Sequence, residues 1–145
     1  MRLIPLMLAA ALAASPALAE ETTAPTGPGP RLALELNALT PSETGCRITF
    51  LATNRLGTEV TRSAFEIALF GAGGGIERLV SLEFKAMPDG KTRVLQFDIG
   101  QVGCDALSRV LINDITACEG EGLDPASCYG ALDTSSRLGQ VEFGV

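Results

Sequence analysis

The chain has 145 residues, enough for one ordinary domain, and carries 11 basic and 17 acidic residues for a net charge of −6. An acidic protein is repelled by nucleic-acid backbones and by anionic lipid surfaces, so neither is an expected partner. Histidine is absent, which excludes nucleophiles activated by imidazole, imidazole zinc sites and histidine pH switches.

Residues 1–19 have the pattern of a secretory signal peptide. Arg2 supplies the positive start, residues 3–14 form an apolar run, and residues 17–19 are the small-residue exit that precedes cleavage. A transmembrane anchor needs about 20 apolar residues, and this run is too short. We therefore expect cleavage before Glu20, export to the periplasm or the exterior, and a mature product with no membrane span.

Residues 20–30 contain three prolines and no large apolar side chain. Such a segment cannot bury enough surface to offset the entropy that ordering would cost. We predict a flexible lead here, followed by a single disulfide-bonded domain over residues 31–145.

From residue 31 onward, apolar and polar residues alternate in short runs, as in half-buried β-strands. In the clearest run, Cys46, Ile48, Phe50 and Ala52 share one face. The glycine-rich residues 71–75 are expected to join two strands as a hairpin. The predicted strands are 31–36, 46–53, 64–70, 76–84, 92–99, 108–112 and 140–145.

A short helical turn is predicted near residues 125–131, because Asp124 is a good N-cap and Pro125 suits the first helical position. With one such turn among about seven short strands, the pattern favours an all-β fold. We expect an immunoglobulin-like antiparallel sandwich. A small β-barrel is the alternative.

The four cysteines are Cys46, Cys104, Cys118 and Cys128. An even number in an exported chain predicts two disulfides, with three possible pairings. We favour a local Cys118–Cys128 clasp, because the polar, glycine-containing segment between them can double back, and a long-range Cys46–Cys104 tie. A redox centre is disfavoured by the lack of a Cys-x-x-Cys motif.

The sharpest candidate for a metal site is the acidic loop of residues 119–124. Glu119, Glu121 and Asp124 are the calcium candidates, since calcium favours oxygen-rich, glycine-kinked loops. The alternative is a solvated acidic loop, and the spacing matches no EF-hand. Residues 71–75 lack the Lys-Ser/Thr that follows a phosphate-binding loop. No motif indicates a cofactor.

Five further acidic residues are scattered over the predicted strands and turns, and no nucleophile and base stand at a catalytic spacing. A carboxylate-dependent enzyme therefore remains only an alternative function, with no catalytic residues assigned. The five residues are Glu66, Glu83, Asp98, Asp105 and Asp114.

Several segments resemble small exported proteins of Gram-negative bacteria that are often labelled Tat pathway signal-sequence domain proteins. The matching residues are Cys46–Phe50, Asn54, Phe65-Glu66, Gln96–Asp98, Cys104, Leu111–Asn113, Cys118 and Cys128. The stretch from residue 54 to residue 90 is also similar to bacterial immunoglobulin-like modules of the FxLYD type. The resemblance implies a β-sandwich in the cell envelope and supplies no catalytic residues. The single Arg2 departs from the twin-arginine label, so the general secretory route is expected.

The leading functional prediction is a non-enzymatic binding or interaction domain in the periplasm. It would present loops, or an open strand edge, to another envelope protein. Residues 71–75 and 119–124 are the candidate contact loops. Besides the enzyme, a secreted inhibitor or small-ligand carrier is an alternative. Converging buried carboxylates would favour the enzyme, a large apolar cavity the carrier, and a filled core with an uncovered edge the interaction domain.

Overall fold

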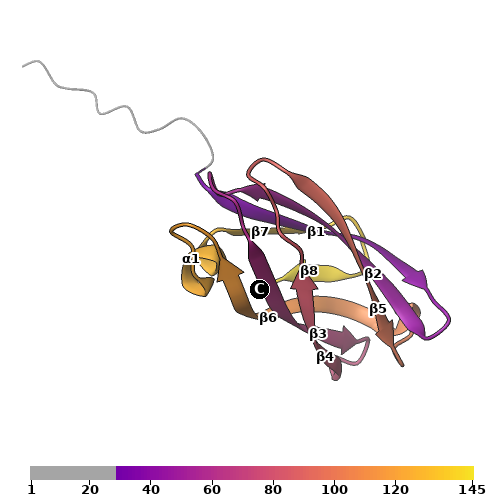
Figure 1. Cartoon of the computed structure of the whole chain (residues 1–145). Coiled ribbons are helices and arrows are strands. Elements are labelled where there is room, and N and C mark those ends of the chain that lie inside the picture. The colour runs from indigo at the N-terminus through magenta and orange to yellow at the C-terminus, as the bar shows by residue number, and fades with distance from the viewer. Residues whose placement is uncertain (1–28) are drawn as a thin grey trace, which may run out of the picture.

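A computed structural model describes residues 29–145 of the chain. The predicted signal peptide, its cleavage site and the lead up to residue 28 lie outside the described residues. The described part forms two four-stranded sheets packed as a sandwich, with one short α-helix (Figure 1). The predicted β-sandwich is confirmed. Over residues 29–145 the two sheets do not close on each other, so the small-barrel alternative is wrong.

The first sheet has the strand order β5-β2-β1-β7. Strand β2 runs antiparallel to both β1 and β5, whereas β7 runs parallel to β1. The period-two pattern places Leu32, Leu34 and Leu36 of β1 in the core, beside the buried row of β2 that begins at Cys46. The strands are β1 (Arg31–Pro41), β2 (Gly45–Arg55), β5 (Thr92–Gly100) and β7 (Leu132–Ser136).

The second sheet has the order β4-β3-β6-β8. Strand β3 is antiparallel to β4 and to β6, and β8 is parallel to β6. Its strands are β3 (Arg62–Gly71), β4 (Ile76–Phe84), β6 (Leu107–Glu119) and β8 (Glu142–Gly144). A 3-10 turn, η1 (Cys104–Ala106), precedes β6, and the helix α1 (Pro125–Gly130) follows it. The predicted 71–75 hairpin and the predicted helical turn are therefore both confirmed.

The structure corrects the strand prediction in three ways. Residues 29–145 form eight strands, because the polar segment Leu132–Ser136 forms β7. Strand β6 extends to Glu119 rather than ending at residue 112, and register shifts accommodate its polar middle. The sandwich is also not wholly antiparallel, since β7 and β8 each pair parallel to a neighbour. Each of these short C-terminal strands pairs parallel with the last long strand of its sheet, β7 with β1 and β8 with β6.

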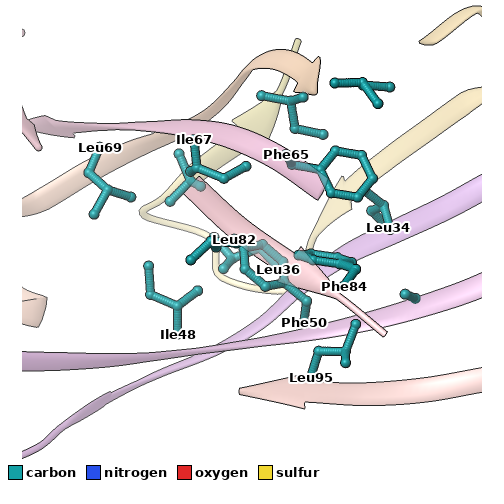
Figure 2. Close-up of a cluster of buried hydrophobic side chains, with 14 of the residues drawn as sticks. Leu34, Leu36, Ile48, Phe50, Phe65, Ile67, Leu69, Leu82, Phe84 and Leu95 are labelled. Carbon is teal, nitrogen blue, oxygen red and sulfur yellow. The ribbon is translucent and has the colours of Figure 1, made fainter. Parts of the chain in front are cut away.

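Phenylalanines from both sheets fill the core (Figure 2). Phe50 of β2 lies 5.6 Å from Phe84 of β4, and Phe84 lies 4.6 Å from Phe65 of β3, between ring centroids. All three side chains are fully buried. Aromatic pairs at these separations add to the burial of apolar surface and lock the two sheets together.

Candidate functional site

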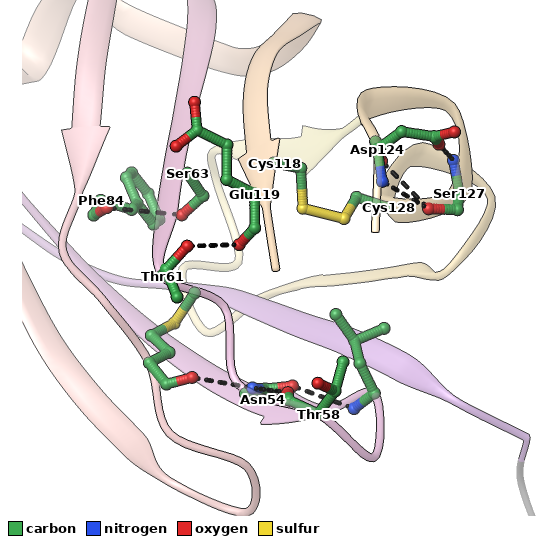
Figure 3. Close-up of a disulfide and its surroundings, with 12 residues drawn as sticks. Asn54, Thr58, Thr61, Ser63, Phe84, Cys118, Glu119, Asp124, Ser127 and Cys128 are labelled. Atoms are coloured by element: carbon green, nitrogen blue, oxygen red, sulfur yellow. Dashed lines mark hydrogen bonds between the residues drawn. A yellow bond between two sulfur atoms is a disulfide. The ribbon is translucent and has the colours of Figure 1, made fainter. Parts of the chain in front are cut away.

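The two disulfides have the favoured pairing, Cys46–Cys104 and Cys118–Cys128. The first bond ties β2 to the turn η1, and the second ties the end of β6 to α1 (Figure 3). Cys46, Cys118 and Cys128 are buried, and the part of the chain that the structure describes has no free cysteine. The cysteines therefore serve as framework.

Asp124 caps the helix α1. Its carboxylate accepts a hydrogen bond from the Ser127 backbone N–H at 2.7 Å, and the Ser127 hydroxyl accepts one from the Asp124 N–H at 3.0 Å (Figure 3). These reciprocal bonds satisfy donors that a helix start leaves open. The bonds from Ser127 to the charged form lower the pKa of Asp124.

The three calcium candidates do not converge. Glu119 accepts a hydrogen bond from Arg62 at 3.3 Å, Asp124 is committed to the helix cap, and Glu121 is exposed. Over residues 29–145, no three His, Cys, Asp or Glu side chains gather closely enough to hold a metal ion. The acidic loop thus has structural partners, and the geometry gives calcium no support.

The five scattered carboxylates also lie apart. Asp98 makes two hydrogen bonds with Arg47, at 3.0 and 3.1 Å, which raise the pKa of that arginine. Glu83 pairs with Arg62, and Glu66 accepts from Asn113. Asp105 and Asp114 are exposed, and the buried polar residues of the described chain are Thr49, Asn54 and Ser63. Converging buried carboxylates, the arrangement that would favour an enzyme, are not found in residues 29–145.

Among the hollows on the surface of residues 29–145, four have volumes of about 170, 360, 420 and 440 Å³. The largest is lined by polar residues, among them Ser42, Arg47 and Asp98. Another adjoins the 71–75 loop, where the Arg109 guanidinium lies 5.6 Å from the centre of the Phe70 ring. All four combine polar and apolar groups, unlike the large apolar pocket expected of a carrier.

Strands β4 and β5 are the long outer strands of the two sheets. Each has nine residues, whereas the opposite outer strands, β7 and β8, have five and three. Because β4 pairs only with β3 in the sheet, alternate backbone N–H and C=O groups of β4 face outward. A free edge of this length can accept a further strand.

The two long edges differ in their side chains. Strand β5 places Arg93 in the core-facing row that also contains Leu95 and Ile99, and the Arg93 Nε is buried without a hydrogen-bond partner. An inward-pointing charge is one of the features that keep an edge from pairing. Strand β4 also has a charged residue in this row, since Arg78 pairs with the buried Leu69. It differs from β5 in exposing two large apolar side chains, Ile76 by 64% and Leu79 by 53%, whereas β5 exposes one, Val94 by 64%.

A register shift explains why both exposed side chains of β4 point the same way. Leu69 of β3 pairs with Arg78, but Phe70 pairs with Ile76, so Glu77 is an extra, unpaired residue. Such a bulge shifts the alternation by one position. Ile76 and Leu79 consequently lie on one face, the outer face of the β4-β3-β6-β8 sheet.

Sequence reasoning anticipated an open edge but did not identify β4 or its residues. The available signal was the adjacent pair Leu79-Val80, because only one of two consecutive apolar residues in a strand can face the core. Of the two predicted contact loops, residues 71–75 lead into β4. Residues 119–124 lie at the other end of β3, since Glu119 pairs with Arg62 and Leu107 with Gly71.

No helix within residues 29–145 is both long and apolar enough to cross a membrane. A scan against models of known protein families finds no match to the chain, and searches of curated proteins and of solved structures find none either.

Proposed function

We propose that this protein is a non-enzymatic interaction domain of the bacterial envelope, which binds an extended segment of another envelope protein along the free edge of β4. One observation carries the proposal. Strand β4 is a nine-residue outer strand that exposes two large apolar side chains, Ile76 and Leu79, beside a filled core.

The location rests on the cysteines. Two disulfides indicate an oxidising compartment outside the cytoplasm. The signal-peptide pattern of residues 1–19 and the resemblance to small exported Gram-negative proteins support the periplasm in particular. The resemblance to FxLYD-type modules likewise supports an immunoglobulin-like assignment for the sandwich.

Binding along β4 would combine two contributions. Main-chain hydrogen bonds to the outward N–H and C=O groups hold an added strand, and they need no special side-chain motif. The Leu79 side chain then contacts the residue of the partner that lies opposite it on the outer face, which buries apolar surface exposed in the free protein.

Photo-crosslinking in the periplasm of a Gram-negative host tests the proposal. A photoreactive residue replaces the exposed Ala72 in the loop that leads into β4, and we expect a discrete adduct with an envelope protein. Adding Leu79→Lys should abolish the adduct, because a lysine on an edge strand opposes pairing.

Val94→Lys is the matched control, since Val94 is 64% exposed on the other long edge, β5. This variant should keep the adduct. An adduct that survives Leu79→Lys, or that both variants remove equally, would contradict binding along β4.

A further inference from the structure

Two neighbouring rows of side chains cross the outer face of the β4-β3-β6-β8 sheet. The first row is apolar and contains Leu79 of β4, Ala68 of β3 and Leu111 of β6, which are partners in the strand register. The second row lies two residues further along β4. It contains Ser81, Glu66 and Asp114, in the same order of strands.

The second row has an unbalanced negative charge. Glu66 and Asp114 are directly opposite each other on adjacent strands, an arrangement that is destabilising for like charges. The ion pairs within residues 29–145 join Arg31 to Asp133, Arg47 to Asp98, and Arg62 to Glu83 and Glu119. None of them neutralises the facing Glu66 and Asp114 carboxylates.

The short side chain of Ser81 is all that separates the free edge of β4 from the row position of Glu66 and Asp114. Adjacent strands are about 4.8 Å apart, so a residue docked opposite Ser81 would lie about 10 Å from the Glu66 backbone. Ser81 is exposed and short. A long cationic side chain on the added strand can therefore pass over it toward the two carboxylates.

We infer that the segment bound by β4 is cationic and apolar in alternation, an inference that rests on the proposed function. The bound segment has a lysine or arginine opposite Ser81. Two positions along, it has an apolar residue opposite Leu79. The cation meets Glu66 and Asp114, and the apolar side chain extends the row of Leu79, Ala68 and Leu111.

The charge of the molecule favours such a partner over a second copy. The chain has a net charge of −6, which opposes self-association and attracts a basic segment. A second copy joined edge to edge through β4 would bring the same net negative charge and another pair of facing carboxylates.

The probes are two peptides, acetylated and amidated, with the sequences Thr-Val-Lys-Thr-Val-Val-Thr and Thr-Val-Glu-Thr-Val-Val-Thr. In each, the third and fifth residues face the same side of an extended strand. NMR titration of the disulfide-bonded protein should give shifts along β4 with the lysine peptide and much weaker binding of the glutamate peptide.

Variants that neutralise one carboxylate at a time test where the lysine of the peptide binds. We expect Glu66→Gln and Asp114→Asn each to lower the affinity for the lysine peptide about two- to fivefold, the range of exposed ion pairs. Each should also reduce the salt dependence of binding. Asp105→Asn is the matched control. It removes one exposed carboxylate at η1, outside the proposed contact, and should leave the affinity unchanged.

The outcomes separate this inference from the proposed function. Equal binding of the two peptides, no binding of the lysine peptide, or an equal effect of Asp105→Asn would overturn the cationic preference. If the Ala72 adduct still disappears with Leu79→Lys but not with Val94→Lys, binding along β4 stands without that preference.

Discussion

At the scale of single residues, Asn54 has an unusually dense set of contacts for a buried polar side chain. Its Nδ2 donates to the carbonyls of Thr58 and Met87, each at 2.8 Å, and its Oδ1 accepts from the Leu56 N–H at 2.9 Å (Figure 3). The side chain is fully buried. It therefore fixes the turn after β2 against the segment that follows β4.

We expect Asn54→Leu to lower the free energy of unfolding by about 2–4 kcal/mol, because it leaves the buried backbone groups that Asn54 binds without hydrogen-bond partners. Urea denaturation measures the loss. The control is Gln140→Leu at an exposed position, for which a change within about 0.5 kcal/mol is typical of surface sites. Similar losses for both variants would contradict the role given to Asn54.

Because the Asp124 carboxylate caps α1, we expect the stability of the folded protein to depend on pH. Its pKa is lower in the folded protein than in the unfolded chain, because Ser127 donates to the carboxylate. The stabilisation is therefore complete above the unfolded pKa of about 4 and is lost as the pH falls through the lower folded value.

Asp124→Ala should lower Tm at neutral pH, and the gap from the unaltered protein should narrow as the pH falls below about 4. Asp124→Asn should keep Tm close to the original at neutral pH, since asparagine caps helices as well as aspartate does. A gap for Asp124→Ala that stays constant into acid would argue against a titrating cap.

At the scale of elements, the two disulfides close loops of different length. Cys46 and Cys104 are 58 residues apart in sequence, and Cys118 and Cys128 are 10 apart. In the loop-entropy model the longer closure contributes about 4 kcal/mol and the shorter about 3 kcal/mol.

We therefore expect the double variant Cys46→Ser with Cys104→Ser to lose more stability than Cys118→Ser with Cys128→Ser. Both should still give the far-ultraviolet circular dichroism of a β-sheet protein at low temperature. Thermal melts of the two double variants make the comparison. The reverse order of stability would show that local strain or packing outweighs loop length.

Elements with strong local signals could be predicted from sequence. The alternating faces of β1, β2 and β3, the hairpin at residues 71–75 and the cap at Asp124 all follow from local patterns. Strand β7 could not, because Leu132–Ser136 has one large apolar residue and becomes a strand through parallel pairing with β1.

The candidate site was harder to predict because it depends on register. Glu77 becomes a bulge, and Glu66 comes to face Asp114, through shifts in the pairing of β3 with its neighbours. A shift of one residue reverses which face a side chain occupies. The sequence indicated an open edge in general, but the particular residues on it depend on pairings between distant segments.

At the scale of the whole molecule, the sandwich is asymmetric in its edges. Strands β7 and β8 are short, and β5 has the inward-pointing Arg93 and one exposed apolar side chain, Val94. Strand β4 has a bulge at Glu77 and Arg78 in its core-facing row, but it is long and exposes both Ile76 and Leu79. A protein that avoids aggregation normally blunts its edges. The two exposed apolar side chains of β4 are consistent with our proposal that a partner covers this edge.

Amide hydrogen exchange tests this central claim most directly, on the protein alone and in complex with the partner recovered by crosslinking at Ala72. We predict that the outward-facing amides of β4 exchange rapidly in the free protein and become protected in the complex, while the amides of β5 are unchanged. Protection on β5, or no new protection on β4, would contradict the assignment of β4 as the binding edge.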